Sequence, residues 1–299
     1  MPGQRAGEPL VHAGPRQAER VVAVPTTISV RHAELSPGSV LTDELWSVVA
    51  DAGCAAASIQ LCAGTLGALS YVHPAIDHSG QRQATFSDTI AVTEPAFLSS
   101  GSATLGLRDG DRFAHLHASW RGSDGQLRGG HLLPGATVGA VPVHAVVRAL
   151  HEVNQYSETD LETGLPAFTP ARRPADALGQ RRGVISRVRP GVDLHEAVLF
   201  ACRKGEFASA TICASLGSVV GARLRTGAGR VVEADWPATE FTELTGTVRY
   251  AETGSPEVIL AGTAVDRNGD VHSGLLIPGQ NPVAVTFELY LEEAAADGG

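Results

Sequence analysis

The spacing of apolar residues changes along this chain in an order that occurs twice. Leu41, Leu45 and Val48 recur at helical spacing. Short β-rich runs divided by Gly, Asp and Pro follow this segment, and each half of the chain ends in a β-branched run, at residues 141–147 and 283–291. A strand, a helix and then several strands in each half predict an α+β fold with antiparallel sheets, each sheet with a packed helix.

The repetition extends to the residues themselves. Each copy of the PG-terminated motif follows a turn containing Asp-Gly or Asn-Gly. Three segments recur in the same order, which indicates two tandem homologous domains: GGHLLPG at 129–135 with SGLLIPG at 273–279, SPGSVLTDELWSVVADAG at 36–53 with RPGVDLHEAVLFACRKG at 189–205, and SIQLCAGTLGAL at 58–69 with ATICASLGSVVG at 210–221. We call residues 21–151 copy one and residues 182–295 copy two.

Two segments outside the copies lack apolar periodicity. Residues 152–181 are rich in proline, arginine and acidic residues, a composition typical of a linker. Residues 1–20 are rich in Arg, Gly, Pro and Gln and lack the apolar core of a signal peptide, so we expect a mobile N-terminal arm. No stretch is long and apolar enough to predict a membrane span.

Composition sets further bounds. The 299 residues are 43% hydrophobic, enough to bury two cores, and the formal net charge of -9 repels a polyanion unless a basic patch overrides the average. The four cysteines have no CxxC spacing. We therefore expect a cytoplasmic protein in which the cysteines are buried free thiols: Cys54, Cys62, Cys202 and Cys213.

Three histidines surround one predicted hairpin. His115 and His117 are two residues apart and project from the same face of a strand, and a turn at residues 123–125 sets His131 opposite His117. Opposed side chains are close enough for three imidazoles to bind one divalent cation, for which zinc is the expected ion. The alternative is a group of half-exposed strand histidines without a metal.

These residues resemble a known family. HLHA at 115–118, a turn with glycine and then GGHL at 129–132 are similar to the signature of the PPC (plant and prokaryote conserved) domain, here in a bacterial type without an AT-hook. The resemblance covers nearly all of both copies, more loosely in copy two. It implies α+β domains that assemble as trimers, and it implies that His115, His117 and His131 are metal ligands, as in some bacterial members.

Copy two departs from this pattern. Leu275, Ala261 and Ile259 stand where copy one has His131, His117 and His115. In contrast, EFTELTG at 240–246 is closer to the family's strand than EPAFLSSG at 94–101, which suggests a site assembled from both copies. Glu240 is therefore a candidate catalytic residue, and its alternative is an exposed strand position.

A cation with three protein ligands leaves positions for water or substrate, an arrangement typical of catalytic zinc. The sequence thus favours a metal-dependent hydrolase, lyase or isomerase acting on a small carboxylate-bearing or carbonyl substrate, with Arg128 attracting an anionic group. Nucleic acid is an unexpected partner, because the chain is acidic and lacks an AT-hook. We expect a homo-oligomer with trimeric packing of PPC units. The alternatives are a DNA-binding regulator and a non-catalytic metal-stabilised assembly protein.

Overall fold

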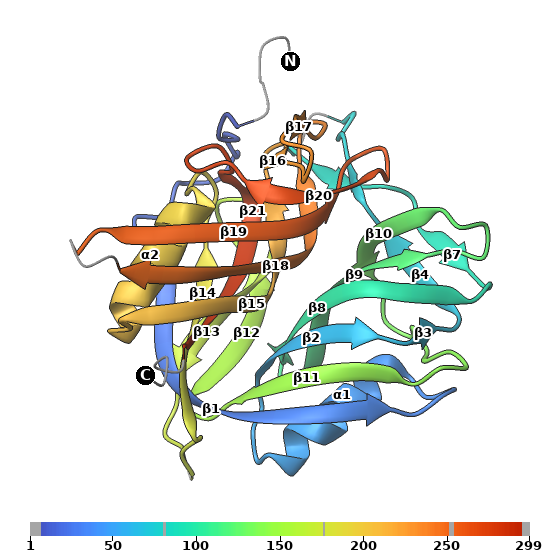
Figure 1. The fold of residues 1–299 in the computed structure, drawn as a ribbon, viewed down its shortest axis with the longest axis horizontal. Helices are drawn as coiled ribbons and strands as arrows, with labels where there is room; N and C mark the ends of the chain where they lie inside the picture. The colour runs from blue at the N-terminus through green and yellow to red at the C-terminus, as the bar shows by residue number, and fades with distance from the viewer. Residues whose placement is uncertain (1–6, 80–81, 176, 251–253, 295–299) are drawn as a thin grey trace.

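The computed structural model describes residues 7–79, 82–175, 177–250 and 254–294 (Figure 1). Two strand-rich halves lie side by side, and each carries one helix on its outer side. Helix α1 spans Leu41–Asp51 in copy one, and helix α2 spans Leu194–Gly205 in copy two. The predicted fold class, two tandem α+β domains with antiparallel sheets, is confirmed.

Copy one forms an antiparallel sheet in the strand order β1-β11-β2-β8-β9-β10-β4-β7, with β3 paired to β8 and a separate β5–β6 pair. Its strands are β1 Val21–Leu35, β2 Ala57–Ala63, β3 Thr65–Leu66, β4 Leu69–Val72, β5 Pro74–Ala75, β6 Thr85–Phe86, β7 Ile90–Val92, β8 Ala96–Arg108, β9 Asp111–Arg121, β10 Leu127–Leu132 and β11 Val143–Leu150.

Copy two repeats this order as β14-β21-β15-β18-β19-β20-β16-β17. Because each of the eight strands in the copy-one order has its counterpart at the same place in copy two, the sequence repeat is a structural repeat. The strands are β14 Arg181–Val188, β15 Ser209–Val219, β16 Arg223–Arg225, β17 Val231–Glu233, β18 Thr239–Tyr250, β19 Pro256–Val265, β20 Val271–Leu276 and β21 Val283–Glu293.

Strand β1 belongs to both sheets. Its first half, from Val21 to Ile28, pairs with β14 of copy two, and its second half, from Ile28 to Leu35, pairs with β11 of copy one. Ile28 is fully buried at the point where the two ladders meet. Backbone hydrogen bonds therefore run without interruption from one copy into the other.

The expected linker at residues 152–181 is instead largely a β-hairpin. Strand β12 (Val153–Thr159) pairs antiparallel with β13 (Pro166–Arg172), and Phe168 is buried beneath it. The low apolar periodicity that suggested a linker reflects buried ion pairs. Asp160, in the turn, contacts Arg187 at 2.6 Å and Arg189 at 2.5 Å.

The expectation of a mobile arm also needs correction. Residues 1–6 lie outside the described residues, but the following segment packs against the rest of the protein. Leu10 is 5% exposed and packs in a small apolar cluster with Val220 and Ala284 of copy two. Arg20 forms an ion pair with Glu162 at 2.7 Å. These contacts hold residues 7–20 in place, so for this part the predicted arm is wrong.

The cysteines carry free thiols, as expected, with no disulfide between them. Cys54, Cys202 and Cys213 are buried. Cys62 differs from the prediction, because it lies near the end of β2, where the strand emerges from the core, and is exposed. Among the residues with described positions, no helix has the length and apolar character needed to cross a membrane.

Candidate metal centre

Strands β9 and β10 bring the three histidines together. The two strands pair antiparallel with His117 directly opposite His131, in the predicted register. His115 precedes His117 by two residues and lies on the same face. One ligand nitrogen from each imidazole can be chosen so that all three atoms lie within 4.8 Å of one another. The hairpin therefore forms a three-imidazole cluster.

Hydrogen bonds fix the tautomers of two of these rings. The Nδ1 atom of His117 lies 2.9 Å from the carbonyl oxygen of Phe241, which can only accept, so Nδ1 carries the proton. The Nδ1 atom of His115 lies 2.7 Å from a carboxylate oxygen of Glu288 and likewise donates. In the neutral rings both Nε2 atoms therefore present lone pairs. They lie 3.0 Å apart, a distance at which two lone pairs repel unless a proton is shared between them or a cation lies beside them.

His131 completes the cluster from β10. Its ring centroid lies 4.9 Å from that of His115 and 5.3 Å from that of His117. Its Nδ1 atom is buried without a hydrogen-bond partner among the described residues. Burial, with the charge of His115 adding to it, lowers the pKa of His131 to about 3. The ring is thus neutral near pH 7, the state in which imidazole binds a metal.

The pKa values of the other two imidazoles are shifted in opposite directions. Burial, and then the neighbouring histidines, lower the pKa of His117 well below its usual value. Burial also acts to lower the pKa of His115, but the Glu288 carboxylate outweighs it and the pKa is raised. Without a metal, His115 is the ring that can take a proton and share it with the lone pair of His117.

Copy two supplies two buried carboxyl groups to this cluster. Glu288 on β21 is 2% exposed and contacts His115, and Glu240 on β18 is 6% exposed with Oε1 4.0 Å from Nε2 of His117. The Oε2 atom of each has no hydrogen-bond partner within the described part of the chain. Burial raises the pKa of Glu240 to about 8. Glu240 is thus largely protonated near pH 7 without a cation, and a bound cation would displace its proton.

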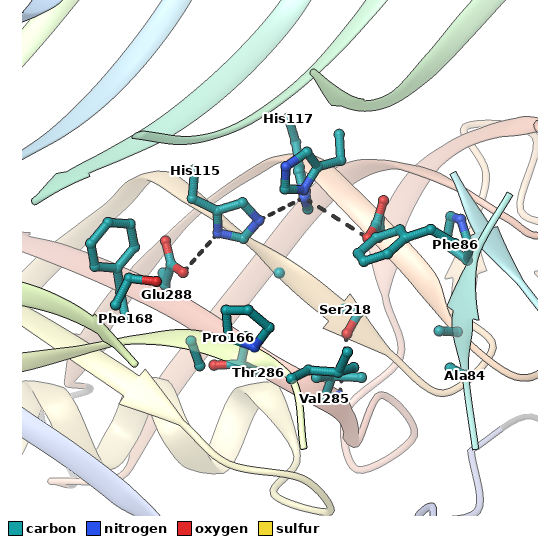
Figure 2. Close-up of a pocket in the computed structure, with 18 of the residues that line it drawn as sticks. Ala84, Phe86, His115, His117, Pro166, Phe168, Ser218, Val285, Thr286 and Glu288 are labelled. Atoms are coloured by element: carbon teal, nitrogen blue, oxygen red, sulfur yellow. Dashed lines mark hydrogen bonds and ion pairs between the residues drawn. The ribbon is translucent and has the colours of Figure 1, made fainter. Parts of the chain in front are cut away.

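A cavity of about 320 Å³ opens beside the cluster, between the two copies (Figure 2). Figure 2 shows His115 and His117 on one side and Pro166, Thr286 and Val285 across from them. The remaining walls are mostly apolar, with Phe86 and Phe168 labelled at the two ends. The Arg108 guanidinium lies 3.5 Å from the ring centroid of Phe113, also in the lining. The histidines thus lie at the contact between the copies.

The two glycines before His131 lie where neighbouring strands approach closely. A Cβ atom on Gly130 would lie 2.3 Å from the backbone oxygen of Val72, and one on Gly129 would lie 3.2 Å from that of Ala118. Because glycine has no Cβ atom, β10 can pack this closely against its neighbours. This close packing holds β10 between β9 and β4.

The structure separates the two predicted catalytic residues. Glu240 lies at the cluster, whereas Arg128 forms an ion pair with Asp124 at 2.6 Å in the hairpin turn and does not line the cavity. Sequence reasoning missed Glu288. The available signal was an acidic residue between the apolar Phe287 and Leu289 of a largely buried strand, because an unpaired buried charge is costly.

These features define a tandem α+β protein with a histidine cluster between its copies. The sequence model of the Plants and Prokaryotes Conserved (PCC) domain matches residues 25–151 and 176–295. The chain therefore belongs to this family and contains two copies of its domain, which confirms the resemblance. None of the curated proteins matches the chain.

Several solved structures are similar to one domain's length of this chain. A hypothetical protein from Salmonella cholerae-suis is 24% identical, with 50% of this chain and 97% of that chain covered and a TM-score of 0.40. A candidate DNA-binding protein from Ralstonia eutropha is 19% identical, with 46% and 88% covered and a TM-score of 0.38. A metal-containing protein from Archaeoglobus fulgidus is 24% identical, with 49% and 97% covered and a TM-score of 0.39.

The comparisons contradict the predicted partner class. We expected a small-molecule substrate and considered nucleic acid an improbable partner. Proteins from Ralstonia eutropha and Bacteroides thetaiotaomicron among the similar structures are instead described as candidate DNA-binding proteins. The small-molecule prediction is corrected accordingly, and the comparisons give no support to an enzyme activity.

Proposed function

We propose that this PCC-domain protein binds one divalent cation, zinc, through His115, His117 and His131, and that the cation stabilises the contact between its two copies. The single observation that carries the proposal is the convergence of one ligand nitrogen from each of the three imidazoles within 4.8 Å, with the Nε2 atoms of His115 and His117 3.0 Å apart. Two nitrogens about 2.0–2.1 Å from one tetrahedral zinc ion are about 3.3 Å apart. The Nε2 atoms of His115 and His117 thus lie close to the spacing of two zinc ligands, and the third imidazole lies within 4.8 Å of them.

A stabilising role is supported by the origin of the surrounding groups. The ligand nitrogens come from copy one, whereas Glu288 and the Phe241 carbonyl, which orient His115 and His117, come from copy two. Metal-ligating histidines usually donate their second N–H to a carboxylate or carbonyl in this way. An ion bound to correctly oriented imidazoles therefore favours the docked arrangement of the copies.

The test is the metal content of the purified chain. We expect about one zinc ion per native chain and almost none in His131→Gln, whose side chain retains much of the volume. The exposed His144, on β11, offers His144→Gln as a matched control that keeps its metal. Native protein that takes up no metal, or a His131→Gln variant with full content and the same affinity, would refute the proposal. Circular dichroism checks that each variant is folded.

A second candidate function is nucleic-acid binding, through arginines at one end of the β12–β13 hairpin. Arg172 ends β13 and Arg173 follows it, and β14 begins with Arg181 and Arg182. Arg172, Arg181 and Arg182 are exposed, although the last two also face Glu292 and Glu293. A local group of arginines is the kind of basic patch that can override an acidic average.

This candidate predicts a charge-dependent affinity for duplex DNA. For Arg172→Glu we expect binding to weaken by roughly tenfold and the salt dependence to flatten by about one unit of slope, as for the loss of one phosphate contact. Fluorescence anisotropy at several salt concentrations measures both. The exposed Arg31 of β1 provides the control Arg31→Glu. No binding by native protein at low salt would exclude this function and leave the metal centre unaffected.

A further inference from the structure

Glu240 is a buried carboxyl group that the proposed three-histidine site does not use. It is 6% exposed, and its Oε2 atom has no hydrogen-bond partner in the described chain. An isolated polar group in the interior is costly, so its retention there calls for a partner. The nearest ligand nitrogen is Nε2 of His117, 4.0 Å from Oε1 of Glu240.

Strand β18 places Glu240 and one histidine in a fixed relation. Phe241, the next residue, accepts the Nδ1–H of His117 through its backbone oxygen at 2.9 Å. The same segment of copy two therefore orients a ligand of copy one and carries a free carboxyl group toward the cluster. Tilting or sliding of β18 would disturb both contacts together.

We propose that Glu240 is the fourth ligand of the cation, which makes the centre a closed His3Glu site built from both copies. The inference rests on the proposed metal site and adds its missing ligand. Nitrogen and oxygen ligands at about 2.0–2.2 Å from a tetrahedral ion are about 3.3–3.5 Å apart. The Glu240 oxygen, 4.0 Å from Nε2 of His117, would have to approach this nitrogen by about 0.5–0.7 Å to reach that distance.

The other carboxyl group cannot take this place. Glu288 contacts His115 through Nδ1 at 2.7 Å, whereas the ligand nitrogen of that ring is Nε2, on the opposite edge of the imidazole from the atom bound to Glu288. Glu288 is thus an orienting group behind the ligand, and Glu240 faces the ion. With both groups ionised, two negative charges balance the charge of one divalent cation in a buried site.

Four protein ligands change the chemistry expected of the ion. A three-ligand zinc site retains an open position for water or substrate, whereas a four-ligand site is closed and typically structural. Closure by Glu240 also places one metal–ligand bond across the contact between the copies. The cation then links copy one to copy two directly, in addition to orienting the histidines.

Cobalt(II), whose visible absorption reports coordination, provides the test in the full chain. We compare native protein with Glu240→Gln, a nearly isosteric change. The control is Glu243→Gln on the same strand, whose residue bonds Gln60 of copy one at 3.2 Å and also spans the copies. We expect Glu240→Gln to bind cobalt at least tenfold more weakly with a changed spectrum, and Glu243→Gln to resemble native protein.

Added thiocyanate tests whether the bound cobalt has an open coordination position. We expect it to leave the native cobalt spectrum unchanged and to alter that of Glu240→Gln, because removal of the carboxylate exposes the ion to added anions. A native spectrum that responds to thiocyanate, or a Glu240→Gln variant with native affinity and spectrum, would overturn the assignment. Failure of native protein to bind cobalt at all would instead refute the metal site itself.

Discussion

Asp160→Asn is expected to lower the free energy of unfolding by about 3–5 kcal/mol, because it removes the negative partner of a buried ion cluster. Asp160 pairs with Arg187 and Arg189, and its other oxygen accepts the backbone N–H groups of Glu162 and Thr163 at 2.9 Å. Asparagine preserves the shape and the turn but leaves the buried guanidinium of Arg187 without its counter-charge. Urea unfolding at pH 7 measures the difference.

The same variant predicts a dependence on pH. Burial alone would raise the pKa of Asp160, but the N–H of Thr163 and the two arginines outweigh it and lower the pKa from 3.8 to about 2. A carboxyl group with a depressed folded-state pKa stabilises the fold above its unfolded value, and this stabilisation is lost as the pH falls through 3.8 toward 2. The difference in unfolding free energy between native protein and Asp160→Asn should therefore narrow as the pH falls from about 5 to about 2.

The control for this prediction is Glu158→Gln, which removes an exposed acid from the same hairpin. We expect a change of less than about 0.5 kcal/mol, typical of a surface substitution. An equal effect from the two variants would show that the loss at Asp160 reflects net charge rather than the buried ion cluster.

Glu288→Ala is expected to weaken zinc binding by roughly 10–100-fold, the usual cost of losing the group that orients a metal-ligating histidine. Its carboxylate holds the Nδ1 proton of His115 and directs Nε2 toward the other histidines. Competition with a chromophoric chelator measures the dissociation constant. Glu288→Gln should lose less zinc affinity, since its amide oxygen can still accept the Nδ1–H of His115.

Glu293→Ala on the same strand serves as the matched control, because this residue pairs with Arg182 and lies away from the histidines. Its zinc affinity should equal that of native protein. If Glu288→Ala bound zinc as tightly as native protein, the orientation of His115 would not depend on copy two, contrary to the role that we assign to Glu288.

The parts of the fold that follow from local pattern could be predicted. Leu41 and Leu45 have helical spacing and lie on the buried face of α1, and the turn at 123–125 determines that His131 faces His117. The β12–β13 hairpin could not be predicted in this way. Its polar residues resemble a linker until Asp160 is seen to contact Arg187 on the later strand β14 and Arg189 just after that strand.

In the candidate site, too, the residues that are close in sequence could be predicted and those brought together by packing could not. Its three histidines lie within one hairpin, so their convergence is a matter of strand register. Glu288 lies 173 residues from its partner His115, and neither residue's sequence surroundings reveal the other. Only the packing of the two copies joins them. Glu240 could be suspected from the family's strand pattern, but its distance from His117 required the structure.

The division of β1 between two sheets limits how this chain can be cut. A fragment ending after copy one would retain Val21–Ile28 without β14, and would expose a row of unpaired backbone groups beside the apolar Val21 and Val24. Open strand edges of this kind recruit other chains and promote aggregation. A separately produced copy two would expose the complementary edge of β14. The two fragments would therefore tend to associate, because the exposed strand edge of each pairs with the edge of the other in the intact chain.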